Sequence, residues 1–442
     1  MQDTTQSSPI PESTGYVRLG RASPAFLLIC SLAVVALQGC VNLSSRNSPP
    51  LGYAAAANDS PMMSIRTLGA DHRYSQQSSG DIARRIQAQN PGEPINILAL
   101  SGGGAGGAFG AGAIVGLSHS GKRPEFAVVT GVSAGALIAP YAFLGPAWDH
   151  QLMEIYTSGS GEHVLQSRGL GAIFGSSMYS GTPLKELVDR YATDGLIESI
   201  ALEASKGRLL LVATTDVNTG EPVVWDLGAI AMHGGSDART LFRDVLVASA
   251  SVPGLFPPII IRVPDDGGQR NETHVDGGVT LPFFVVPSPA DMPGDAIDQT
   301  GDQAQARGAR LYVLIDGQLG EQPRATRLRT STIMSRSVSA SLNRMMRTTL
   351  ELTAATAEQR GIALDYSAIP VSYPYHGALD FSAATVRPLF QYAYECARTG
   401  RLWTAFRPAA GRVGGAQVGL DGPTAPCPAD DAFIARFAGR QR

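Results

Sequence analysis

The sequence lacks the surplus of positive charge that a nucleic-acid-binding protein needs. Across 442 residues, 35 lysines and arginines stand against 38 aspartates and glutamates, and the net charge is −3 at neutral pH. Binding to a phosphate backbone depends on a basic surface. We therefore set nucleic acid aside as a partner, and the composition indicates no particular protein partner.

Cysteine is also scarce, and metal-ligand patterns are missing. The four cysteines are Cys30, Cys40, Cys396 and Cys427. None has the close spacing of a metal site, and no cluster of histidine, cysteine and aspartate has it either. We expect no catalytic metal and no cofactor.

The N-terminal apolar run, residues 25–37, is too short to span a bilayer comfortably. Arg18 and Arg21 precede it, as in a secretory signal. The run ends in Leu-Gln-Gly-Cys, which resembles a bacterial lipobox and implies that Cys40 becomes the lipidated first residue. The alternatives are an uncleaved anchor or an ordinary signal peptide. The resemblance implies an envelope protein that faces the periplasm, with Val41 favouring the outer membrane.

The same processing would leave two cysteines in an oxidising compartment. Cys30 would leave with the signal and Cys40 would carry lipid, so we predict a disulfide between Cys396 and Cys427. The alternative is two free thiols.

Strand and helix patterns alternate along the chain after a polar N-terminal stretch. This alternation predicts an α/β fold, and we expect a three-layer α/β/α sandwich with a central, mainly parallel sheet. The expected strands are residues 95–100, 126–130, 208–214, 258–263, 273–275 and 310–315, and the expected helices are residues 134–144, 183–191, 239–250, 327–359 and 386–398. The expected parts are a signal peptide (1–39), a lipidated tether (40–92), a catalytic domain (93–406) with an insertion loop (287–308), and a loose tail (407–442).

The strongest chemical motif is G-x-S-x-G, formed by Gly131, Ser133 and Gly135 between a strand and a helix. A nucleophilic serine needs an exposed hydroxyl on a sharp turn, and small neighbours relieve the crowding there. The start of the helix adds free amides beside the hydroxyl.

A glycine-rich loop follows the first strand and contains Gly102, Gly103, Gly104, Gly106 and Gly107. Successive glycines let backbone amides converge on an anion, as the tetrahedral intermediate of acyl transfer requires. The same glycines satisfy G-x-G-x-x-G, but the acidic residue that dinucleotide binding needs after the next strand is missing. The loop is therefore interpreted as an oxyanion hole.

Asp276, followed by Gly277 and Gly278, ends a short strand. An aspartate can deprotonate a serine hydroxyl that it contacts, although Asp-Gly-Gly alone is a turn signal.

The three motifs in this order resemble patatin-like phospholipases. Further stretches that carry the resemblance are Leu100–Gly104, Val128–Ser133, Ala248–Pro253 and Phe256–Pro258. The resemblance implies a Ser–Asp dyad of Ser133 and Asp276, an oxyanion loop at residues 102–107, and hydrolysis of acyl esters in lipids.

This sequence departs from the family where many members have a basic residue, because it has Gly106. The departure puts the preference for phospholipids in question more than ester hydrolysis itself. The alternatives are a small-ester or lysophospholipid esterase on the same dyad, or a non-catalytic lipoprotein that binds lipid or a partner. A conventional triad through His376 complies with the chain order, but the motif around His376 is typical of a turn.

Overall fold

The structure is a computed structural model of the chain, and it describes residues 66–68, 95–166, 176–265, 268–286, 309–320 and 328–406. All of these residues belong to one compact unit, Ala56–Arg442. The predicted signal peptide with Cys40, the insertion loop and the tail with Cys427 lie outside the described residues. So does the predicted tether, except for residues 66–68.

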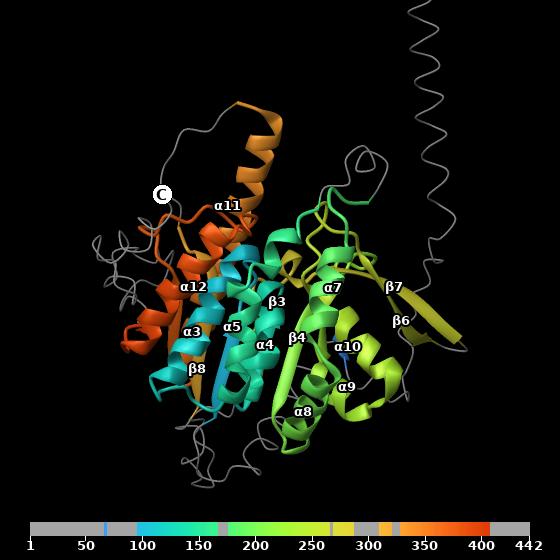
Figure 1. Cartoon of the computed structure of the whole chain (residues 1–442), viewed down its shortest axis with the longest axis horizontal. Helices are drawn as coiled ribbons and strands as arrows, with labels where there is room; N and C mark the ends of the chain where they lie inside the picture. The colour runs from blue at the N-terminus through green and yellow to red at the C-terminus, as the bar shows by residue number, and fades with distance from the viewer. Residues whose placement is uncertain are drawn as a thin grey trace, which may run out of the picture. The chain divides into compact units, whose positions relative to one another are not determined.

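A ten-stranded mixed sheet forms the centre of this unit, and its middle strands run parallel (Figure 1). The order is β1-β5-β4-β3-β2-β8-β9-β10, while β7 pairs with both β4 and β6. The strands are β1 (Arg66–Leu68), β2 (Asn96–Leu100), β3 (Val128–Val132), β4 (Leu209–Asp216), β5 (Glu221–Asp226), β6 (Ile259–Asp265), β7 (Gly268–Asp276), β8 (Arg310–Gln318), β9 (Ala363–Ile369) and β10 (Thr404–Ala405). Strands β4, β3, β2, β8 and β9 lie side by side in this order, and each pairs in parallel with its neighbour. Antiparallel pairs lie on either side of them.

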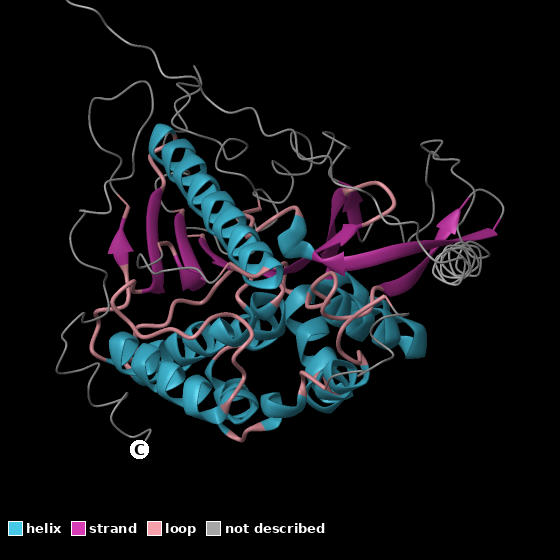
Figure 2. Cartoon of the chain, turned by 90° about the horizontal axis from the view of Figure 1, so that it is seen from above, coloured by secondary structure: helices cyan, strands magenta, loops and turns pink. Residues whose placement is uncertain are grey.

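Helices cover both faces of the sheet, as the three-layer prediction requires (Figure 2). They are α3 (Gly107–His119), α4 (Ala134–Leu144), α5 (Asp149–Thr157), α7 (Thr182–Tyr191), α8 (Asp194–Ser205), α9 (Leu227–His233), α10 (Gly235–Ser249), α11 (Thr330–Gln359) and α12 (Ala383–Arg398). Short 3₁₀ turns include η3 (Gly104–Gly106) and η6 (Gly277–Val279). Within the described ranges, no helix is long and apolar enough to cross a membrane.

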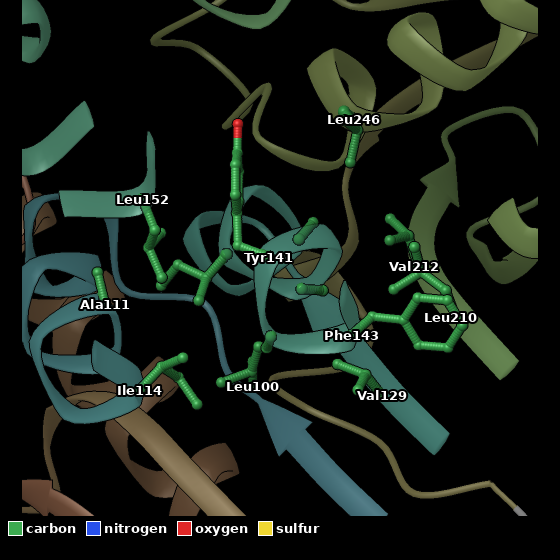
Figure 3. Packing of buried hydrophobic residues seen from close by; sticks show 14 of the residues in the cluster. Leu100, Ala111, Ile114, Val129, Tyr141, Phe143, Leu152, Leu210, Val212 and Leu246 are labelled. Atoms are coloured by element: carbon green, nitrogen blue, oxygen red, sulfur yellow. The ribbon is translucent and has the colours of Figure 1, made fainter. Parts of the chain in front are cut away.

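The central strands are buried on both faces, which explains their continuous apolar sequences. Every residue of β3 and of β4 is buried. Successive side chains alternate between two cores. Leu100, Val129 and Leu210 face α3, α4 and α5 in the larger core (Figure 3). Val128 and Val132 face the other core, which α11 covers.

The predicted elements agree closely with the observed ones, and α4 has the predicted bounds. The prediction missed β5, β9, β10, α5, α8 and α9, and it gave only residues 273–275 of the longer β7. It also missed β1, which lies within the stretch expected to be tether and adds an edge strand to β5. Arg66 of β1 is buried against Glu272 of β7, so an ion pair ties this short strand to the sheet.

Candidate active site

Ser133 lies in a strained turn between β3 and α4. With φ of 54° and ψ of −121°, it is the one non-glycine residue of positive φ in the described part of the chain. Such a backbone costs on the order of 1–3 kcal/mol and is typical of functional sites. A Cβ on Gly131 would lie 2.7 Å from the carbonyl oxygen of Gly135, and one on Gly135 would lie 2.5 Å from that of Leu100. The two motif glycines therefore make the turn possible.

Strand β4 brings Asp276 beside Ser133. Val132, the last residue of β3, pairs with Ala213 of β4. Strand β4 continues beyond the end of β3, and its next residue, Thr214, pairs with Asp276 at the end of β7. Strands β3 and β7 thus end head to head along one side of β4. Ser133, which follows Val132, therefore faces Asp276.

The two side chains form a short hydrogen bond. The Ser133 hydroxyl donates to Oδ2 of Asp276 over 2.6 Å, and the amide of Gly278 donates to Oδ1 over 2.7 Å. Both side chains are almost fully buried, at 6% and 4% exposure. Burial raises the pKa of Asp276 to about 7, against the hydrogen bonds from Ser133 and Gly278, which lower it. A carboxyl group with this pKa can accept and return a proton near neutral pH.

The glycine-rich loop offers two free amide donors. The amides of Gly102, Gly106 and Gly107 already donate to backbone carbonyls. Those of Gly103 and Gly104 have no acceptor among the described residues. Five glycines were predicted to donate to an oxyanion, and two of them, Gly103 and Gly104, have amides available for it. The other three amides donate within the turn into α3 or to a neighbouring loop.

The loop is fastened to the serine turn. A Cβ on Gly102 would lie 3.2 Å from Cβ of Ser133, so the loop passes directly beside the hydroxyl-bearing residue. The carbonyl of Ser101 accepts a hydrogen bond from the amide of Gly135 over 3.1 Å. Gly104 has φ of +56°, a conformation that favours glycine. The loop and the turn thus form one rigid site.

The sequence motifs gave no role to Ser249, which holds the serine turn in place. Its hydroxyl accepts the Ser133 amide over 3.0 Å and donates to the carbonyl of Ala213 over 2.7 Å. Ser249 is fully buried at the end of α10. It lies in the Ala248–Pro253 stretch that carried part of the family resemblance, so a signal was present without an assigned role.

His376 of the alternative triad, and His274 two residues before Asp276, lie in other networks. His376 contacts Asp380 and Thr385, and its side chain is 53% exposed. His274 is buried between Thr214 and Glu272. Among the described residues, the Ser133 hydroxyl bonds to Asp276 and to no histidine. The structure thus brings together the pair Ser133 and Asp276 and keeps His376 apart.

Two other aspartates, both at the ends of strands, hold local turns. Asp216 accepts the amide of Asn218 in a turn, and Asp226 accepts the amide of Ala229 at the start of α9. The described residues contain no group of three or more histidine, cysteine or acidic side chains that could hold a metal ion.

Cys396 is buried on α12 and forms a disulfide. Its predicted partner, Cys427, lies outside the described residues, so the pairing stays a prediction.

Comparison with known proteins assigns the domain to a family. No curated protein sequence matches the chain. Among solved structures, the chain is similar to VipD from Legionella pneumophila, with 13% identity, a TM-score of 0.28, and coverage of 71% of this chain and 68% of that chain. The family model described as patatin-like phospholipase matches residues 98–287, a range that includes the glycine-rich loop, Ser133 and Asp276. The chain therefore carries, over residues 98–287, a domain of the patatin-like phospholipase family.

Proposed function

We propose that the protein is a serine acyl hydrolase that cleaves acyl esters of lipids, phospholipids included, through a dyad of Ser133 and Asp276. Family membership supports a lipid acyl hydrolase in general terms. The single observation that carries the finer proposal is the 2.6 Å hydrogen bond from the Ser133 hydroxyl to Asp276, in a turn that strains the serine backbone.

The first half of the reaction forms an acyl-serine. The Ser133 oxygen attacks the ester carbonyl while the Asp276 carboxylate takes the hydroxyl proton. The amides of Gly103 and Gly104 donate to the developing oxyanion, where one donor is typically worth about a hundred- to a thousandfold in rate. The intermediate collapses, the C–O bond to the alcohol breaks, and Asp276 gives its proton to the leaving alcohol.

The second half returns the enzyme to its starting state. A water molecule attacks the acyl-Ser133 carbonyl and gives its proton to Asp276. Collapse of the second intermediate breaks the bond to the Ser133 oxygen, which takes the proton back from Asp276. The products are one alcohol and one carboxylic acid, and Asp276 alone carries the proton in both directions.

Replacing Ser133 with alanine tests the nucleophile. We expect Ser133→Ala to lower ester hydrolysis by several orders of magnitude and to abolish labelling by a fluorophosphonate, with thermal unfolding that stays cooperative. A matched control is Ser367→Ala, because Ser367 is a buried serine of β9 whose hydroxyl has no hydrogen-bond partner among the described residues. The control should keep its activity. Substantial hydrolysis by folded Ser133→Ala would disprove the assignment.

A series of substrates distinguishes the lipid hydrolase from the small-ester alternative. Hydrolysis should rise with acyl-chain length and be faster on a phospholipid than on a lysophospholipid or a soluble short-chain ester. A clear preference for the lysophospholipid or for the short ester would favour the alternative esterase on the same dyad.

A further inference from the structure

Helix α11 extends past the carboxyl ends of the central strands (Figure 1). Ser133 lies at this end of the sheet, because it directly follows β3. Its C-terminal part covers the sheet, where Leu350, Ala354 and Ala357 are buried. The guanidinium of Arg347 donates to the carbonyl of Leu319, just after the end of β8. At this residue the helix therefore passes the carboxyl ends of the strands. We name residues 328–346, which precede it, the α11 arm.

The carboxyl end of β8 is also the edge that holds the catalytic loops. The Ser101 amide donates to the carbonyl of Leu314 in β8, and the Asp316 amide donates to the Ser101 hydroxyl. Ser101 precedes the glycine-rich loop, and its carbonyl accepts the amide of Gly135. The α11 arm and Ser133 thus lie at the same end of the sheet, where the parallel strands finish.

The arm exposes large apolar side chains that a water-facing helix does not need. Leu328 is 92% exposed, Val338 56%, and Ile333 and Leu342 44% each. Val338 and Leu342 are four residues apart and so share a helix face. The residues between them are small and exposed, namely Ser339, Ala340 and Ser341. The face is therefore open to a partner.

The sequence of the α11 arm carries positive charge and no negative charge. Between residues 328 and 346 it has three arginines and no aspartate, glutamate or lysine, although the whole chain has a net charge of −3. Arg329 and Arg344 are exposed and form no ion pair with a described residue. A helix with exposed apolar side chains, several arginines and no acidic residue has the composition of a helix that lies in a membrane interface.

Further exposed apolar side chains lie on segments next to the catalytic loops. Val279, 48% exposed, follows the Gly278 amide that binds Asp276. Leu379, 45% exposed, follows Ala378, whose carbonyl accepts a hydrogen bond from the amide of Ala105 in the glycine-rich loop. Met178, 54% exposed, belongs to a segment bridged to the loop after α10. We name these three residues, which lie on segments that contact the catalytic loops or their neighbours, the apolar rim.

We propose that the α11 arm and the apolar rim dock onto the surface of an anionic lipid bilayer and so present Ser133 to lipid. This inference rests on the proposed function for its purpose, but the docking itself does not require hydrolysis. Charge complementarity decides between occupants. A second copy of the arm would bring arginines against arginines, whereas anionic headgroups neutralise them and the apolar side chains enter the acyl region.

A fluorescent reporter on the full chain tests the docking. In a Ser133→Ala background, which leaves the lipid intact, Val338→Cys and Leu352→Cys are each labelled with an environment-sensitive dye. The unsubstituted background, treated in the same way, is the blank. Leu352 is the matched control because it is 67% exposed on the same helix, about 21 Å along it from Val338 and beyond the arm.

We expect the dye at position 338 to shift to the blue on vesicles that contain phosphatidylglycerol, and to shift much less on phosphatidylcholine alone or in high salt. The dye at position 352 should not respond. No lipid-dependent shift at position 338, or an equal shift at position 352, would overturn the proposal. A shift that needs no lipid and grows with protein concentration would also overturn it, in favour of a second copy.

Charge variants give a second readout. Arg344→Gln should weaken binding to anionic vesicles about fivefold, because one basic residue near such a surface contributes roughly a factor of this size. Arg344→Lys should keep most of the affinity. In the active protein, Arg344→Gln should slow hydrolysis of vesicle lipid and leave hydrolysis of a soluble short-chain ester unchanged. If the parent chain hydrolyses neither substrate, the proposed function fails while the dye still reports docking.

Discussion

A buried carboxylate that works without a histidine has to be negative to accept the serine proton, yet its surroundings favour the neutral form. Asp276 is in this position, because burial raises its pKa while Ser133 and Gly278 donate to the charged form. If it is the base, Asp276→Asn should reduce hydrolysis nearly as much as Ser133→Ala. His376→Ala should keep most of the activity, because His376 contacts Asp380 and Thr385 instead. The reverse pattern in steady-state kinetics would indicate a conventional triad.

The raised pKa also predicts how activity depends on pH. Only the carboxylate of Asp276 can take the proton, so kcat/KM should rise with pH through an apparent pKa near 7. The residual kcat/KM of Asp276→Asn should not show this dependence on pH. A profile that is flat from pH 5 to pH 8 (roughly the range in which histidine alone would titrate) would contradict the role of Asp276.

Stability should change in the opposite direction. The folded pKa of Asp276, about 7, lies above the ordinary aspartate value of 3.8, so its proton is bound more tightly in the folded state. The stability that comes from this proton is fully present below the unfolded pKa and is lost as the pH rises through about 7. The loss should be on the order of a few kcal/mol, and Asp276→Asn should flatten this part of the pH dependence of Tm.

At the scale of elements, α12 shows how a packed helix can fasten a chain end. Cys396 is fully buried on this helix and is disulfide-bonded. If Cys427 is its partner, the closed loop of about 30 residues should contribute roughly 3–4 kcal/mol in the chain-entropy model. Cys427→Ser should therefore lower Tm by several degrees, and a reductant should lower the Tm of the parent chain to the same value.

Peptide mapping without reduction checks this pairing directly. A cross-linked peptide that contains Cys396 and Cys427 is the expected result. A free Cys427 thiol, or Cys396 joined to another cysteine, would show the predicted pairing to be wrong.

Helix α11 illustrates which properties of an element depend on its neighbours. Its sequence predicted one long helix, and the structure contains one. The pattern did not indicate that only the C-terminal part would cover the sheet, because exposure depends on where β8 and β9 end beside the helix. The missed strand β5 has a related explanation. It is short and contains Pro222, so its own sequence favours a strand only weakly. Its pairing with β4 and β1 stabilises the strand.

At the scale of the whole molecule, we propose that the domain is held at the cell envelope through lipid on Cys40, which lies outside the described residues. One acyl chain anchors only marginally, whereas two or more anchor stably. Cys40→Ala should therefore block normal processing or release soluble protein, as fractionation and mass spectrometry of the N-terminus would show. An unmodified Cys40 within a longer intact N-terminus would contradict the prediction, and recovery in the inner-membrane fraction would contradict the outer-membrane assignment.

By itself, the sequence determined the local part of this protein. The G-x-S-x-G turn, the glycine-rich loop and most strands and helices follow from residue types at short spacing, because backbone sterics and burial periodicity act over a few residues. The motif order was specific enough to indicate the family, which the family model confirms.

Only the tertiary structure decided which of these parts meet. Ser133 and Asp276 are 143 residues apart in the chain and touch because β3 and β7 end against the same stretch of β4. The choice of Gly103 and Gly104 as free donors, and the hold of Ser249 on the Ser133 amide, likewise depend on hydrogen bonds between distant segments. Contacts of this kind are set by how strands pair and how helices pack against them, and no short stretch of sequence contains that information.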